Sequence, residues 1–157
     1  MSKIQSGRES NATSLHQLMF VLQRLSDELL DREAGVGLAQ VRIMAELHTS
    51  RAYSQSLVAH KLGQSEANVS RQLHTMKKDG LVRITKNKKD GRQRDVILTP
   101  KGKRQVEKAE KLLQSQHREM LKLLSTAEAK SFNKVVNHLL TALNVETRRN
   151  QKIFGSE

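Results

Sequence analysis

Polar and basic side chains gather on one side of a predicted helix between Glu66 and Lys78. The apolar residues of this segment, Val69, Leu73 and Met76, are four and three positions apart, so they share one helical face. The other side, with the preceding serine, offers groups that can bond base edges or phosphates: Ser65, Asn68, Ser70, Arg71, His74, Thr75 and Lys78. Asparagine can pair with adenine and arginine with guanine in the major groove. The pattern predicts a DNA-reading helix; the alternative is a solvated polar face.

A second charged group follows in a predicted β-hairpin. Residues 81–85 and 95–99 are strand-like, and Asp90-Gly91 between them is a strong turn signal. The hairpin tip carries the charged residues Lys88, Lys89, Asp90, Arg92 and Arg94. We expect Arg92 to enter a minor groove, whose negative potential attracts a guanidinium, while the other cations meet phosphates. The alternative is an edge hairpin that is charged for solubility.

The net charge of the chain is concentrated around these two elements. Between Arg71 and Arg104 there are 12 Lys and Arg and 3 Asp, a net charge of +9 out of +12 for all 157 residues. Such a basic chain, with a pI of about 10.3, favours a polyanionic partner. We expect double-stranded DNA and no membrane, because no segment approaches the roughly 18 apolar residues that a span requires.

Other chemistry has little support in the residues. Cysteine is absent, which excludes disulfides and thiolate ligands, and the six histidines lack the spacing that puts two ligands on one helical face. No nucleophile–base arrangement, phosphate loop or carboxylate pair can be identified. We therefore expect no enzyme, no metal and no cofactor. The absence of cysteine and of an apolar N-terminal signal sequence suits a cytoplasmic protein.

The remaining elements are predicted to be helices that position the two charged groups. Residues 1–11 are expected to fray, and helices are expected over 12–32, 38–49, 54–62 and 103–124, followed by one from a capping box at Ser125-x-x-Glu128 to about residue 148. Gly63-Gln64 makes the turn before the polar helix. The residues expected to face inward are Leu38, Val41, Met44 and Leu47; Leu57, Val58 and Leu62; Val106, Ala109, Leu113, Met120 and Leu124; and Phe132, Val136, Leu139 and Leu143.

This order of elements predicts a mainly α (α+β) fold. We expect a single module over 1–157, with a winged helix-turn-helix over 35–102 as its DNA-binding part. The flanking helical parts, 12–34 and 103–150, carry more apolar surface than the winged helix can cover. The first part has an apolar seam whose spacing alternates between three and four residues: Leu15, Leu18, Leu22, Leu25 and Leu29. Both helical parts are therefore predicted to form the interface of a homodimer.

Two motifs resemble those of the MarR family. The helix-turn-helix reads Ala59-x-x-Leu62-Gly63-x-Ser65-x-x-x-Val69-Ser70-Arg71-x-Leu73-x-x-Met76-x-x-x-Gly80-Leu81-Val82, with Met76 in place of a commoner leucine. The wing reads Asp90-x-Arg92-x-x-x-Val96-x-Leu98-Thr99-x-x-Gly102. The resemblance implies that Asp90 pairs with Arg92 and holds it in position. It also implies repression by promoter occlusion, relieved by a small aromatic or anionic effector between the dimerisation helices and the winged helix; no effector-binding residue is assigned.

The function expected from the sequence is that of a homodimeric, sequence-specific DNA-binding transcriptional regulator. It is expected to act as a ligand-responsive repressor on a pseudo-palindromic operator, with half-sites about one helical turn apart. One alternative is a non-specific architectural nucleic-acid-binding protein that binds DNA or RNA without reading bases. Another is a dimeric ligand-binding or adaptor protein that has lost DNA binding, against which the intact wing motif, Asn68 and Arg71 argue.

Overall fold

A computed structural model of the chain describes residues 2–48, 53–87 and 94–143, with side chains from residue 13 onward. The described residues form six helices and three short strands, which confirms the mainly α fold with a small sheet. The helices are α1 (Ser2–Ala34), α2 (Leu38–His48), α3 (Gln55–Leu62), α4 (Glu66–Lys78), α5 (Pro100–Leu121) and α6 (Thr126–Ala142). The chain divides into two compact units, Met1–Gln105 and Val106–Glu157.

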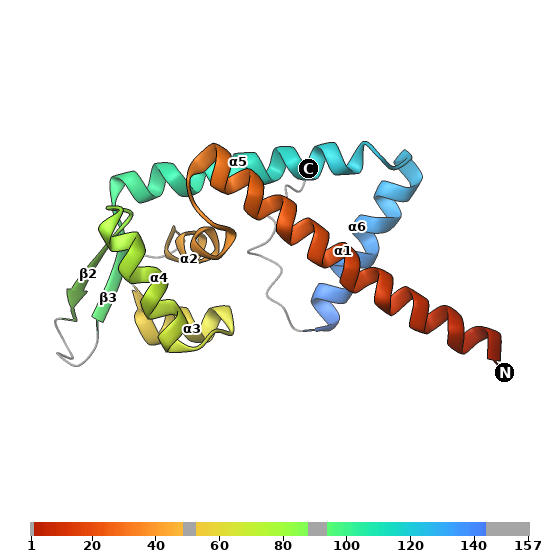
Figure 1. The fold of residues 1–157 in the computed structure, drawn as a ribbon, viewed down its shortest axis with the longest axis horizontal. Coiled ribbons are helices and arrows are strands. Elements are labelled where there is room, and N and C mark those ends of the chain that lie inside the picture. The colour runs from red at the N-terminus through yellow and green to blue at the C-terminus, as the bar shows by residue number, and fades with distance from the viewer. Residues whose placement is uncertain (1, 49–52, 88–93, 144–157) are drawn as a thin grey trace. The chain divides into compact units, whose positions relative to one another are not determined.

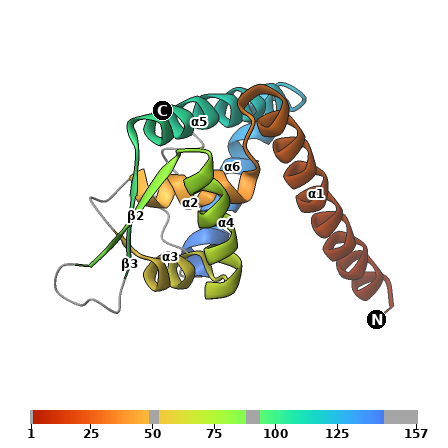
Figure 2. The same cartoon turned by 60° about the vertical axis from the view of Figure 1, so that its left-hand side comes forward.

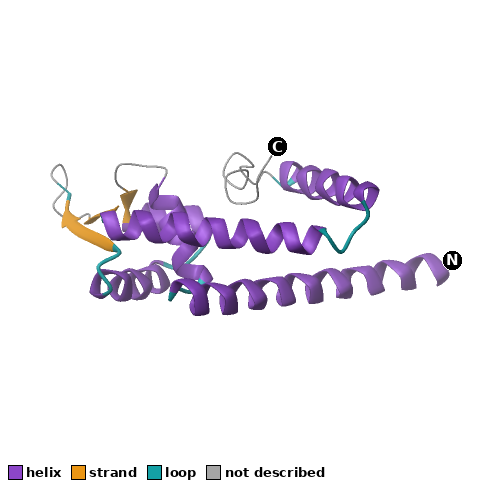
Figure 3. Ribbon diagram, turned by 90° about the horizontal axis from the view of Figure 1, so that it is seen from above, coloured by secondary structure: helices purple, strands orange, loops and turns teal. Residues whose placement is uncertain are grey.

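The first unit contains α2, α3 and α4 beside an antiparallel sheet (Figure 1). The strands are β1 (Tyr53–Ser54), β2 (Val82–Lys86) and β3 (Arg94–Leu98), and β3 lies between the other two. Val82 pairs with Leu98 and Lys86 with Arg94, so the predicted hairpin is confirmed (Figure 3). The two residues of β1, which pair with β3, were not predicted because so short a strand has no alternation to detect.

The core of the first unit joins α2, α3, α4 and β3. Buried apolar residues include Val41, Met44 and Leu47 of α2, the predicted row Val69, Leu73 and Met76 of α4, and Val96 of β3. In α3 the prediction was partly wrong, because Leu57 is exposed while Val58 and Ala59 are buried. Leu57 lies in the first turn of this short helix, and the face that meets the core is the one on which residues 58 and 59 lie.

Local capping explains why the helix-turn-helix boundaries were predictable. The Ser54 and Ser65 hydroxyls accept hydrogen bonds from the backbone N–H groups of Leu57 and Asn68, at 3.2 and 3.3 Å. Gly63 ends α3 with φ of +61°, a conformation in which a Cβ is strained. Gly80, with φ of +72°, follows α4. The backbone N–H of Leu81 donates a hydrogen bond to the carbonyl of Met76 at 2.8 Å. The helix therefore spans 66–78 as predicted.

Other helix boundaries required correction. The expected fraying of residues 1–11 was wrong for 2–11, which belong to α1; no proline interrupts them, and helix propagates more easily than it nucleates. Helix α5 starts at Pro100 rather than Lys103 and ends at Leu121 rather than Leu124. Proline is tolerated at the first helical position, and the Thr99 hydroxyl accepts the N–H of Gly102 at 3.0 Å. The predicted end of the second helix, at Thr49, lies outside the described residues, whereas α6 ends at Ala142 and not near residue 148.

The second unit contains the rest of α5, with Val106, Ala109 and Leu113 buried, and α6. The predicted capping box at Ser125 and Glu128 is present. None of the residues of α6 is buried, so the inward placement of Phe132, Val136, Leu139 and Leu143 does not hold within one chain. In the first unit, Leu15, Leu18 and Leu25 of α1 are likewise exposed, whereas Leu30 is buried. No helix in the described segments is long and apolar enough to cross a membrane.

Candidate nucleic-acid interface

The polar side of α4 is the centre of the candidate interface. Because Val69, Leu73 and Met76 have no exposed surface, they fix the rotation of this helix about its axis. The predicted site residues Ser65, Ser70, Arg71, His74, Thr75 and Lys78 are all exposed, and Asn68 is half-buried. Figure 2 shows α4 next to α3 and the hairpin strands. The arrangement presents a helix with a fixed rotation, whose exposed side chains can reach a groove of DNA.

The hairpin supplies a second part of the interface. Arg94 is exposed at the start of β3, opposite Lys86 at the end of β2. The Asn87 Nδ2 group donates to Asp95 Oδ1 at 2.9 Å and links the two strands there. The predicted tip residues Lys88, Lys89, Asp90 and Arg92 lie outside the described residues. The structure thus describes the base of the wing and its flanking cations.

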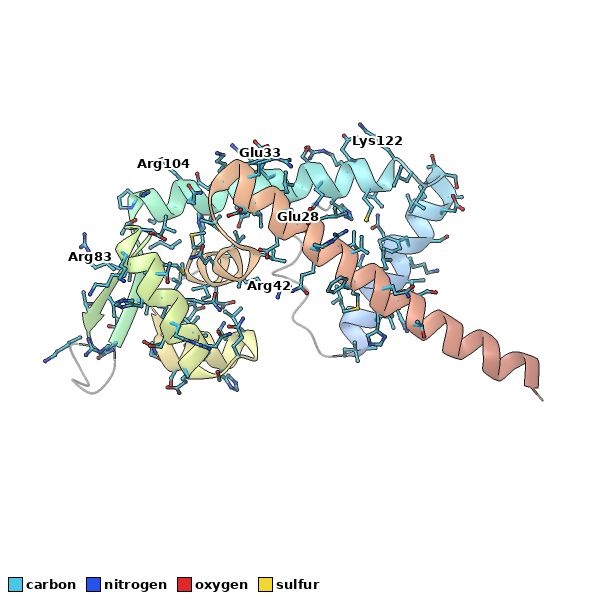
Figure 4. The ribbon with its side chains drawn as sticks, in the orientation of Figure 1. Glu28, Glu33, Arg42, Arg83, Arg104 and Lys122 are labelled. Carbon is cyan, nitrogen blue, oxygen red and sulfur yellow. The ribbon has the colours of Figure 1, made fainter. Side chains whose placement is uncertain are left out.

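Positive charge extends over the first unit beyond the predicted residues. Lys77, Arg83, Lys86, Lys101, Lys103 and Arg104 are also exposed, and Figure 4 labels Arg83 on β2 and Arg104 near the start of α5. The ion pairs found in the described part of the chain involve Arg24, Arg32, Lys61 and Lys122 instead. The described cations between Arg71 and Arg104 form no ion pair with another described residue, which leaves a surface suited to phosphates.

The start of α5 fixes the wing to the end of α4. The Thr99 hydroxyl donates to the Gly80 carbonyl at 2.7 Å, and Lys101 Nζ donates to the Asp79 carbonyl at the same distance. A Cβ added to Gly102 would lie 2.0 Å from the carbonyl oxygen of Leu81. The glycine that closes the wing motif is therefore needed for close packing. These contacts hold the hairpin and α4 in one arrangement.

Sequence reasoning missed one residue beside the site. The Gln64 Oε1 atom accepts hydrogen bonds from Asn68 Nδ2 at 3.0 Å and Gln72 Nε2 at 3.3 Å. The spacing of four between these amides was the signal that could have found it. Among the described residues, no group of three or more His, Asp and Glu could hold a metal ion.

Comparisons with known proteins agree with this geometry. Residues 34–93 match the model of the MarR family. Wild-type MarR from E. coli, in the apo form, is 22% identical with a TM-score of 0.74, and the match covers 82% of this chain and 95% of that one. The S. aureus MepR–DNA complex is 17% identical with a TM-score of 0.70, covering 85% and 97%. BldR from Sulfolobus solfataricus is 19% identical with a TM-score of 0.69, covering 88% and 99%.

No curated protein sequence matches the chain significantly. At these identities the solved structures establish a shared fold. The MarR family model matches residues 34–93, which hold most of the winged helix, in agreement with the two motifs. The resemblance that the two motifs indicated is thereby confirmed.

Proposed function

We propose that this protein is a sequence-specific DNA-binding transcriptional regulator. The observation that carries the proposal is the exposed polar side of α4, held in place by three wholly buried apolar residues. A helix fixed in this way can present Ser70, Arg71 and His74 to base edges. The cations of the wing and of its base then contact phosphates and set the position of the helix. A DNA complex among the structures of similar fold is consistent with this use of the fold.

The active form in this proposal is a homodimer. Apolar residues on α1 and, separately, on α6 and its C-cap remain exposed in one chain, among them Leu15, Leu18, Leu139 and Leu143. Exposed apolar rows of this kind are typical of surfaces that a second copy covers. A two-fold dimer presents two recognition helices, so its operator is a pseudo-palindrome with half-site centres about 10 bp apart.

Ligand-responsive repression is the finer part of the proposal, and it rests on the resemblance to the family. Bound at a promoter, the dimer blocks transcription in the cytoplasm. A small aromatic or anionic effector that prefers a different dimer state lowers operator affinity by shifting the equilibrium between the two states. Transcription then resumes.

Selection of bound sequences from random DNA tests the proposal. The full-length protein is expected to enrich an inverted repeat. Its affinity for that repeat should exceed its affinity for random DNA by at least about 10³-fold at one fixed salt concentration. Sedimentation should give twice the chain mass at micromolar concentration. Equal affinity for all sequences would overturn the proposal in favour of a non-specific architectural protein, which the exposed cations would also suit.

A further inference from the structure

We propose that Gln64 is a positioning residue for base recognition, and that it orients the Asn68 amide to read adenine. This inference rests on the proposed function. Gln64 lies in the turn before α4. Its side-chain oxygen accepts hydrogen bonds from the side-chain amides of Asn68 and Gln72, at 3.0 and 3.3 Å. The three amides are four residues apart, so they form one row from the turn along the first half of α4.

The hydrogen bonds determine which way each amide points. An amide has an acceptor end and a donor end of nearly equal shape, so an isolated exposed Asn can present either one. If the Asn68 amide turned over, its oxygen would face the Gln64 oxygen, and two acceptors would meet without a hydrogen. If the Gln64 amide turned over, its nitrogen would face two donor groups. The orientations of the three amides are therefore coupled, and in the structure Gln64 accepts while Asn68 and Gln72 donate.

Gln72 strengthens this arrangement from the other end of the row. Its Oε1 atom is buried and has no hydrogen-bond partner among the described residues. The bond from Gln72 Nε2 to Gln64 is the hydrogen bond that the structure gives this side chain. Removal of the Gln64 oxygen would therefore leave both donors, the amides of Asn68 and Gln72, without this acceptor.

The orientation leaves Asn68 with the groups that adenine requires. An amide nitrogen carries two hydrogens, and one of them is used by Gln64. The second hydrogen and the Oδ1 atom remain, and adenine offers one acceptor, N7, and one donor, the N6 amino group, in the major groove. Asn68 lies in the first turn of α4, the part of a recognition helix that contacts base edges. Gln64 thus prepares Asn68 for a bidentate contact before DNA arrives.

Two substitutions of Gln64 separate this role from a structural one. Gln64→Met keeps the length of the side chain and removes the acceptor. Gln64→Glu keeps an acceptor for both donors and adds a negative charge. Gln40→Met is the matched control, because Gln40 is a half-buried glutamine of α2 whose Oε1 accepts the N–H of Gly37 at 3.2 Å. For each full-length variant, thermal unfolding and affinities for the selected operator and its single-base variants are measured.

The expected result is specific to certain operator positions. Asn68→Ala identifies the positions that Asn68 reads, at which we expect adenine. Gln64→Met should lose on the order of tenfold preference at those positions and keep the preference elsewhere. It should have no further effect in the Asn68→Ala background. Gln64→Glu should retain the preference and weaken binding to all sequences alike, because its charge repels phosphates. Gln40→Met should change no preference.

The failure of this inference differs from the failure of the proposed function. If wild-type protein shows no preference for any sequence, the proposed regulator is wrong and Gln64 has no base reading to assist. If wild-type protein is specific but Gln64→Met retains the full preference at the Asn68 positions, the role of Gln64 is overturned and the regulator stands. A loss spread evenly over all operator positions would likewise overturn it.

Discussion

Lys61 Nζ lies 3.2 Å from Oε1 of Glu46, a carboxylate whose side chain has no exposed surface. The same ammonium group lies 5.0 Å from the centre of the Tyr53 ring. Glu46 belongs to α2, Lys61 to the last turn of α3, and Tyr53 to β1, which pairs with β3 of the wing. One cation therefore connects the first helix of the helix-turn-helix to α2 and to the sheet.

Replacing Lys61 by methionine should destabilise the fold because it removes positive charge beside a buried carboxylate. We expect the free energy of unfolding in urea to fall by about 2 kcal/mol, less than the roughly 3–5 kcal/mol typical of wholly buried pairs. The difference arises because 31% of the Lys61 side chain is exposed. The control is Glu28→Gln at the exposed pair with Arg24 (Figure 4), which should cost less than about 0.5 kcal/mol. Equal costs would contradict this role of Lys61.

A methyl group at Gly102 should be poorly tolerated. Gly→Ala inside a helix normally adds roughly 0.5–1 kcal/mol of stability. Here the new Cβ would lie 2.0 Å from the backbone oxygen of Leu81, so α5 would have to separate from the base of the wing. Gly102→Ala should lower the melting temperature and weaken DNA binding. Gly37→Ala, whose nearest contact would be Asp27 Oδ1 at 3.4 Å, is the control. A Gly102→Ala protein as stable as wild type would refute the packing argument.

Elements with local signals were predictable from the sequence. The boundaries of α4 follow from the Ser65 cap and Gly80, and its buried row follows from helical spacing. The hairpin follows from two strand-like segments around Asp90-Gly91. In each case the residues that specify the element lie within a few positions of it, so the pattern and the structure have the same cause.

Features that depend on distant contacts were not predictable. Glu46 is buried beside Lys61, 15 positions away in the sequence, and it carries no pattern that distinguishes it from a surface residue. The exposure of Leu57 depends on which side of α3 meets the core. The role of Gln64 could not be found by residue type alone, because its two partners lie on the following helix. Tertiary packing decided the burial of Glu46 and the exposure of Leu57, whereas the Gln64 hydrogen bonds join residues only four and eight positions apart.

Arg71 is expected to contribute to base recognition without contributing to stability. Its side chain is exposed, and it forms no ion pair in the described part of the chain. Arg71→Ala should cost roughly 1–3 kcal/mol of operator binding and relax the preference at particular positions. Lys77→Ala removes the same charge from the same helix and should weaken all sequences alike. If the two variants give the same position-by-position profile in a binding assay, Arg71 contacts the backbone rather than a base.

The start of α6 should be sensitive to acid. Ser125 donates from its backbone N–H at 2.8 Å and its hydroxyl at 2.7 Å to Glu128 Oε2, and these bonds lower the pKa of the Glu128 carboxyl. Because the folded pKa lies below the unfolded value of about 4.3, this stabilisation is complete above that pH. It is lost as the pH falls through the folded pKa.

Glu128→Ala tests this expectation. Its helical content by circular dichroism should be lower than that of wild type near pH ~7, and the difference should disappear well below pH ~4. Glu119→Ala, at the exposed pair with Lys122, should change the helical content little at any pH. A difference between Glu128→Ala and wild type that is the same at every pH would mean that the carboxylate charge is not involved.

At the wing tip, a role in net charge and a role in positioning predict opposite changes in operator affinity. Asp90 and Arg92 lie outside the described residues, but the ends of their loop are held by the pairing of Lys86 with Arg94. We expect Arg92→Ala to weaken operator binding severely and to leave dimerisation and thermal stability nearly unchanged. Arg92→Lys should restore part of the loss, because lysine keeps the charge but lacks the planar guanidinium.

The change in operator affinity caused by Asp90→Ala distinguishes the two roles. Removing a negative charge from a surface that faces phosphates should tighten binding if only net charge matters. We expect weaker binding instead, because the resemblance to the family implies that Asp90 holds Arg92 in place before DNA arrives. Affinities for one operator at one salt concentration, with Arg92→Ala/Asp90→Ala as the double variant, decide the matter. In the Arg92→Ala background, Asp90→Ala should no longer weaken binding. If Asp90→Ala alone tightens binding, the carboxylate is a turn residue and its positioning role fails.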